Sequence, residues 1–110
     1  MKINLNQKFL DPKGGPLLER DKDKVGVLGE EREVFLRQAC ENACLSNHDS
    51  NKINGDEKNR RYKTWLKIAK SEEDIVNLDS KEITKLKDNI GAIYPPLIVG
   101  QAWEMLENGS

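Results

Sequence analysis

Apolar side chains recur three or four residues apart in four stretches of the chain, a spacing that places them on one face of a helix. The predicted helices cover about residues 30–46, 56–70, 79–93 and 97–107. Their apolar stripes are, in order, Leu36, Ala39, Cys40 and Ala43; Tyr62, Trp65, Leu66 and Ala69; Ile83, Leu86, Ile90 and Ile93; and Ile98, Val99, Ala102, Trp103 and Leu106.

Polar and turn-forming residues predict where these helices begin and end. Acidic residues crowd the start of the first helix, and Asp56 and Glu57 place negative charge at the positive end of the second. Residues 79–82 have the arrangement of a capping box, and Pro95 and Pro96 end the third helix and open the fourth. The stretches 47–55 and 71–77 are predicted to be connections.

The first 29 residues follow a different pattern, in which Ile3 and Leu5 alternate with polar residues and turn chemistry fills 11–16. Residues 2–19 are predicted to form a short hairpin or an extended arm, and 20–29 a connection. Val25, Val27 and Leu28 leave two alternatives for that connection, a third short strand or a hydrophobic staple to the next helix. An isolated hairpin is marginally stable, so the arm must pack on the helices. The side chains expected to do so are Ile3, Leu5, Phe9 and Leu17.

These elements predict a mainly α fold, a compact bundle of three to four helices with a short N-terminal β-hairpin or extended arm. The 110 residues are enough for one modest core, so 1–110 is interpreted as a single domain with its helical body at 30–107. Charged residues make up 34% of the chain and hydrophobic residues 36%, but the hydrophobic residues are grouped at helical spacings. This grouping favours a folded domain over disorder.

Charge is segregated along the chain although the net charge is only −1. The segment 58–70 carries six Lys or Arg residues and no acid, so the rest of the chain is acidic. Such a basic patch is expected to attract an acidic partner. On an ideal helix one flank of this segment presents the residues predicted to bind that partner, Arg60, Lys63, Lys67 and Lys70.

The basic helix has two other interpretations that the sequence leaves open. In one, the same flank meets the phosphates of a nucleic acid, with Arg61 on the opposite flank in a second contact. In the other, it is a solvated face paired with acids of its neighbours, and Tyr62 and Trp65 are core residues. A helix-turn-helix is disfavoured because the break at 47–55 is too long and polar for its tight turn.

Metal chemistry has only weak sequence signals. Cys40, Cys44 and His48 are four residues apart, but no further Cys or His exists to complete a closed zinc site. The two cysteines are therefore interpreted as reduced core residues and His48 as a solvated residue near a helix end. The loop 49–55 resembles a calcium loop only out of register, since Ile53 falls at a ligand position.

No arrangement of residues specifies a reaction. The chain has one His, and it has no nucleophile elbow, P-loop or dinucleotide-binding glycine pattern. The sequence predicts a protein that is not an enzyme and needs no cofactor. The opening residues lack the apolar region of a signal peptide, and no apolar run approaches a membrane span, so a cytoplasmic location without membrane contact is expected.

Four stretches, KINLNQKFLDPKGGPL, RYKTWLKIAK, VNLDSKEITKLKDNIG and YPPLIVGQAWEMLE, resemble small proteins of unassigned function encoded by bacteriophages and prophages. The shared motifs are packing motifs, so the resemblance assigns no catalytic or binding residue. It implies a phage-encoded accessory protein that acts in the bacterial host cytoplasm on a host or virion component.

Three functions are compatible with these patterns. The leading hypothesis is a protein-interaction module whose contact surface is the basic helix or the apolar segment 94–106, with Tyr94, Leu97 and Trp103 as contact residues. The alternative is a nucleic-acid binder that uses 58–70. A third class, an assembly chaperone, predicts self-association. The sequence does not decide between a host factor and a virion component as partner, and it leaves the oligomeric state open.

Overall fold

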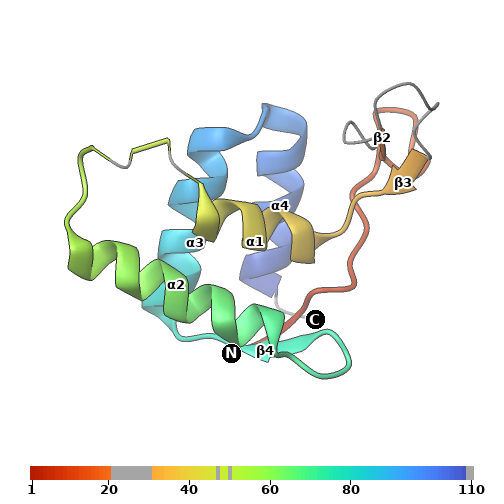
Figure 1. Ribbon diagram of the computed structural model, residues 1–110. Helices are drawn as coiled ribbons and strands as arrows, with labels where there is room; N and C mark the ends of the chain where they lie inside the picture. Colours follow the sequence, from red (N-terminus) through yellow and green to blue (C-terminus); the bar gives the residue numbers. More distant parts are fainter. Residues whose placement is uncertain (21–30, 47, 50, 109–110) are drawn as a thin grey trace.

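Four helices form most of the structure, a computed structural model that describes residues 1–20, 31–46, 48, 49 and 51–108 (Figure 1). The helix α1 packs against both α2 and α3, and α3 packs against α4. The mainly α fold with a small amount of β structure, predicted from the sequence, is confirmed. The helices are α1 (Leu36–Leu45), α2 (Gly55–Ala69), α3 (Ser80–Ile93) and α4 (Pro96–Asn108).

The β structure consists of two short antiparallel pairs. Strand β1 (Lys2–Asn4) pairs with β4 (Ile75–Asn77), so Ile3 lies opposite Val76. Strand β2 (Leu18–Arg20) pairs with β3 (Glu31–Glu33). The prediction of a plain connection at 71–77 was therefore wrong. A three-residue strand is too short to show an alternating pattern, so its partner could not be recognised.

The N-terminal arm packs on the helices as predicted. Ile3, Leu5 and Phe9 are fully buried and Leu17 is half-buried. Backbone hydrogen bonds hold the arm to the chain that leads into α1, because the N–H of Phe9 donates to the carbonyl of Val34 at 2.9 Å. The predicted alternatives for Val25, Val27 and Leu28 lie outside the residues that the structure describes.

Helix α1 begins at Leu36 rather than near residue 30, so the predicted start of the first helix was wrong. The preceding residue, Phe35, has extended backbone angles, and its N–H donates to the side-chain oxygen of Gln38 at 2.8 Å. Two of the acids that suggested an earlier start, Glu31 and Glu33, belong to β3. The predicted stripe of α1 is nevertheless correct, since all four of its members are buried.

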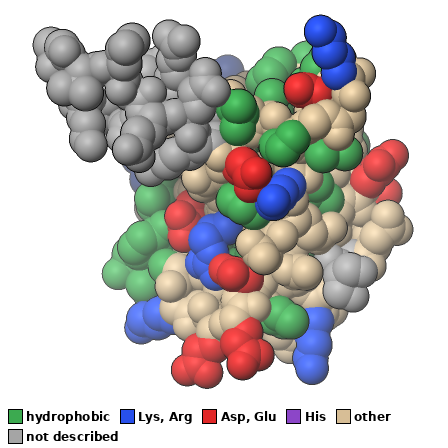
Figure 2. Space-filling view, turned by 90° about the vertical axis from the view of Figure 1, so that its right-hand side faces the viewer, with side chains coloured by type: hydrophobic (Ala, Val, Ile, Leu, Met, Phe, Trp, Pro, Cys, Tyr) green, Lys and Arg blue, Asp and Glu red, His purple; other side chains and the backbone are tan. Residues whose placement is uncertain are grey.

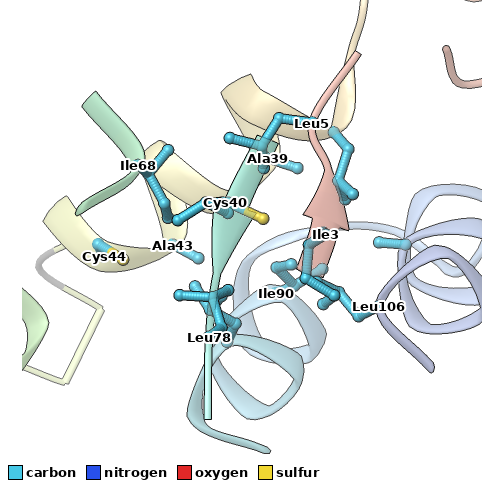
Figure 3. Close-up of a cluster of buried hydrophobic side chains, with 14 of the residues drawn as sticks. Ile3, Leu5, Ala39, Cys40, Ala43, Cys44, Ile68, Leu78, Ile90 and Leu106 are labelled. Atoms are coloured by element: carbon cyan, nitrogen blue, oxygen red, sulfur yellow. The ribbon is translucent and has the colours of Figure 1, made fainter. Parts of the chain in front are cut away.

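One core joins the arm and the helices. Figure 3 shows Ile3 pointing toward Ile90 of α3 and Leu106 of α4, while Ile68 of α2 approaches α1 near Cys40. All five side chains are fully buried. Burial of apolar area at about 25 cal/mol per Å² is the main stabilising contribution for such a core. The arm is therefore part of the hydrophobic core and not an appendage.

Helix α2 buries a face that matches the predicted stripe only in part. Trp65 of the stripe packs against the core and Leu66 is partly buried, whereas Tyr62 is half-exposed and Ala69 is exposed. The buried residues of the helix are Arg61 and Ile68. Burial of Arg61 is tolerated because carboxylates surround it, and Tyr62 keeps an aromatic contact, stacking on Trp65 at 6.0 Å between ring centroids.

Arg37 of α1 binds the strained turn that follows α2. Its guanidinium donates to the carbonyl of Ile68 at 2.7 Å, to Ser71 Oγ at 2.6 Å and twice to Asp74 Oδ1. Glu73 and Asp74 both have positive φ angles, 56° and 59°. A left-handed conformation costs a residue with a side chain about 1–2 kcal/mol. The hydrogen bonds to Arg37 therefore offset the strain of the turn that leads into β4.

Candidate functional site

A groove of about 670 Å³ lies between α2 and α3. The two helices are held apart because α1 packs against both of them, and Cys44 of α1 contributes to the lining. We call this feature the basic groove. It has six cationic side chains and three carboxylates among its lining residues. The cations are Arg60, Arg61, Lys63 and Lys67 from α2 and Lys81 and Lys85 from α3.

The structure brings three of the four predicted contact residues into the basic groove. Arg60, Lys63 and Lys67 line it, whereas Lys70 caps the C-terminal end of α2 outside it. Lys63 and Lys81 are exposed and have no ion pair with any residue that the structure describes. The positive charge of these two lysines is therefore not neutralised by an ion pair with any carboxylate in the described part of the chain.

Two shielded glutamates connect the walls of the basic groove. Glu57 of α2 lies 3.7 Å from Lys85 Nζ, and Glu82 of α3 accepts a hydrogen bond from Lys67 Nζ at 2.9 Å. Glu82 also closes the predicted capping box of α3, because Asp79 and Glu82 each accept a hydrogen bond from the other's backbone N–H. Partly exposed ion pairs stabilise a fold by about 0–1 kcal/mol each. Their main effect here is to link α2 to α3.

Arg61 is mostly buried and is held by carboxylates at the side of the groove. It is 9% exposed, and both of its terminal nitrogens donate to the carboxylate of Asp49, at 2.7 and 2.8 Å. Its Nε is buried 3.6 Å from Glu57 and has no hydrogen-bond partner in the described part of the chain. The Asp49 carboxylate thus fixes the connection between α1 and α2 against the side of α2.

This pair predicts a specific pH dependence. The hydrogen bonds from Arg61 lower the pKa of Asp49 from 3.8 to about 2. A lowered pKa means that the folded state favours the ionised carboxylate, so the stabilisation is complete above pH 4 and is lost as the pH falls toward 2. We expect Asp49→Asn to be less stable than the wild type at pH 7, with most of the difference lost by pH 2 and the remainder below it. Urea unfolding across this range measures it, and a difference that does not change with pH would contradict the assignment.

The floor of the basic groove is less polar than its rim. Leu86 and Asn89 of α3 and Cys44 of α1 contribute to it, and all three are buried. Both cysteines are free thiols, as predicted, and both lie in the core. Burial raises the pKa of the Cys44 thiol to about 12, so the sulfur stays protonated near pH 7.

The predicted apolar contact residues each have a different set of contacts. Tyr94 accepts a hydrogen bond from the amide of Asn42 in α1 at 2.8 Å. Leu97 is partly exposed and lies on the face of α4 whose Gln101 binds the backbone of Leu10. Trp103, expected to face inward, is 37% exposed and donates to the carbonyl of Lys87, whose ammonium lies 4.8 Å from the Trp103 ring.

On the side of the molecule that carries β2 and β3, the described Lys and Arg side chains are not gathered into a patch comparable to the groove. Figure 2 shows Lys and Arg side chains interspersed with Asp and Glu side chains there, with hydrophobic side chains between them. One such pair is Lys8 and Glu33, 3.0 Å apart. Mixed charges of this kind attract neither an acidic nor a basic partner over distance.

Sequence reasoning missed half of the basic groove. Lys81 and Lys85 were not recognised because they belong to a different helix, and the sequence did not fix how α2 and α3 are placed. Asn89 did leave a signal, since it follows Leu86 by three residues and precedes Ile93 by four, and so occupies a stripe position of α3. A polar residue at such a position indicates a buried polar group.

Neither metal binding nor membrane crossing finds support in the geometry. Within residues 1–20, 31–46, 48, 49 and 51–108, no three His, Cys, Asp or Glu side chains gather as metal ligands do. His48 is exposed, and its Nδ1 lies 3.0 Å from Ser46 Oγ. None of the described helices is both long and apolar enough to traverse a lipid bilayer.

Comparison of the chain with protein families, with curated proteins and with solved structures found no match. The function is therefore argued from the geometry and charge of the basic groove.

Proposed function

We propose that this chain is a non-enzymatic protein-interaction module that binds an acidic partner protein through the basic groove. The observation that carries the proposal is that α2 and α3 both contribute cations to one concave surface. The excess of cations over carboxylates attracts acidic surfaces and speeds their association. A concave surface also excludes water from the contact better than an exposed helix face does.

The chemistry of the groove supports a binding role over catalysis. Its one thiol among the described lining residues, that of Cys44, is kept protonated by burial, which raises its pKa. Its glutamates are held in ion pairs with Lys67 and Lys85. No side chain lining the groove is a histidine that could take up or release a proton near pH 7.

The proposed setting is the bacterial cytoplasm, with the chain encoded by a phage or prophage and acting on a host factor or a virion component. The support for this setting is the resemblance of residues 2–17, 61–70, 76–91 and 94–107 to small phage proteins. The setting guides the choice of lysate in the experiment below, and the binding proposal does not depend on it.

The alternative function is nucleic-acid binding by α2. It is favoured by Lys63 and Lys70, which are exposed and have no ion pair among the described residues. Phosphate contacts would then give an affinity that falls steeply with salt concentration. The carboxylates of the groove count against this alternative, because they lie among the cations that a phosphate backbone would have to follow.

Charge reversal at the two uncompensated lysines tests both functions. We expect Lys63→Glu/Lys81→Glu to lose at least about ten-fold in partner retention, because like charges meet in the contact. The immobilised chain is incubated with nuclease-treated bacterial lysate, and retained proteins are quantified by mass spectrometry. The matched control is Lys2→Glu/Lys13→Glu, which changes the net charge equally at exposed lysines outside the groove.

The proposal is supported if an acidic protein is retained by the wild type and the control but lost by the groove variant. Equal retention by all three chains would overturn it. If untreated lysate yields only nucleic acid, and the groove variant loses it, the alternative function is correct.

A further inference from the structure

Asn89 of α3 is a mostly buried residue whose side-chain amide has no hydrogen-bond partner among the described residues. The residue is 5% exposed and lines the basic groove. Its amide is not among the described side-chain atoms that are shielded from solvent and lack a partner, so its polar atoms reach the groove. Amide groups in protein sites are almost always hydrogen-bonded, to protein or to water. The Asn89 amide is therefore available to hydrogen-bond a group that fills the groove.

The surroundings of Asn89 indicate the chemistry of the group that its amide would bind. Leu86, one turn away in α3, and Cys44 of α1 make the adjacent floor apolar. An amide side chain donates and accepts hydrogen bonds at once, as a peptide group does. A peptide backbone is thus the complementary group, and an apolar side chain beside it has a floor to pack against.

The rim restricts the composition of such a peptide. The uncompensated Lys63 and Lys81 favour acidic side chains above the floor. Glu57, Asp79 and Glu82 also line the groove, so a chain with a negative charge on every unit would be repelled at those points. A peptide avoids the repulsion by placing neutral residues there, which a nucleic acid cannot do.

From these features we infer that the basic groove binds a short acidic peptide segment of the partner protein, with one apolar residue as its anchor. The anchor packs on Leu86 and Cys44, a peptide group of the segment pairs with the Asn89 amide, and flanking carboxylates meet Lys63 and Lys81. This inference rests on the proposed function. It adds that the partner binds through a short acidic peptide segment and that Asn89 hydrogen-bonds the backbone of that segment.

A randomised dodecapeptide library displayed on phage tests the inference without a known partner. We expect peptides selected on the full chain to share at least two Asp or Glu residues flanking one large apolar residue. The affinities of synthetic copies are then measured by fluorescence anisotropy. Replacing the apolar residue with serine, or the acids with their amides, is expected to weaken binding about ten-fold. A selection that enriches no such peptides overturns the inference.

The variant Asn89→Leu separates a recognition role from a structural one. We expect it to weaken peptide binding about ten-fold and to change the midpoint of thermal unfolding by less than about 4 °C, because the Asn89 amide makes no hydrogen bond with a described residue that the replacement would break. A residue with a purely structural role would lose stability and binding together. Asn59→Leu makes the same replacement on an exposed part of α2 outside the groove and should leave binding unchanged.

The two proposals fail in distinguishable ways. If acidic peptides bind and Lys63→Glu/Lys81→Glu abolishes the binding, but Asn89→Leu does not weaken it, the module stands and the role of Asn89 is refuted. If selected peptides bind all variants equally, both proposals are refuted. Preferential binding of a single-stranded oligonucleotide over every selected peptide would refute the inference in favour of nucleic-acid binding.

Discussion

Replacement of Arg37 by alanine is expected to lower the free energy of unfolding by about 3 kcal/mol, because several charge-assisted hydrogen bonds between α1 and the turn after α2 are lost at once. The guanidinium joins α1 to the carbonyl of Ile68, to Ser71 and to Asp74. Asp74 has a left-handed backbone conformation, so the turn loses both its hydrogen bonds and the restraint on its strain. Urea unfolding followed by tryptophan fluorescence measures the effect.

Two further variants make the Arg37 prediction specific. Arg37→Lys should recover only part of the stability, since one ammonium cannot reproduce the planar set of donors that meets three acceptors. Arg60→Ala removes an arginine that is 74% exposed and should change the free energy of unfolding by less than about 0.5 kcal/mol. If Arg37→Ala lowered the free energy of unfolding as little as Arg60→Ala does, the prediction would be contradicted, because contacts other than those of Arg37 would hold the turn.

Replacement of Ile3 by alanine should destabilise the protein by about 4 kcal/mol, the upper range for a buried isoleucine that leaves a cavity. Ile3 belongs to a three-residue strand, yet it is 0% exposed and points toward Ile90 and Leu106 (Figure 3). The replacement therefore removes apolar contacts between the N-terminal arm and the helices α3 and α4. Urea unfolding at pH 7 is the appropriate measurement.

The matched control for Ile3 lies on the partner strand. Ile75 of β4 belongs to the same ladder but is 45% exposed, so Ile75→Ala should destabilise by less than about 1 kcal/mol. Similar effects for the two variants would mean that the arm is held by its backbone pairing and not by the core.

Local sequence signals predicted the elements that local interactions build. The capping box at Asp79 and Glu82 and the prolines after Tyr94 both act within a few residues, and α3 and α4 lie close to their predicted bounds. The stripe of α1 was correct for the same reason, because helical spacing alone decides which of its residues can share a face.

The features that sequence reasoning missed depend on contacts between distant parts of the chain. Strand β4 exists because β1 lies beside it, more than 70 residues earlier in the chain. The buried face of α2 is set by Arg61, whose burial requires a carboxylate from the preceding connection. A hydrophobic pattern assigns an arginine to the surface, so it could not predict this face.

Only some of the residues of the basic groove could be predicted from the sequence, for a related reason. Arg60, Lys63 and Lys67 belong to one continuous basic segment, which a charge pattern identifies directly. Lys81 and Lys85 become part of the same surface only once α1 has placed α3 across from α2. A groove between two helices is a property of their packing, and no local pattern encodes it.

The pairing of β1 with β4 also determines when the protein can fold during synthesis. Ile3 leaves the ribosome early, but its strand partner follows at 75–77 and its core neighbour Leu106 later still. The arm therefore cannot complete its core until residues as far as Leu106 have been synthesised, and its apolar side chains stay in water until then.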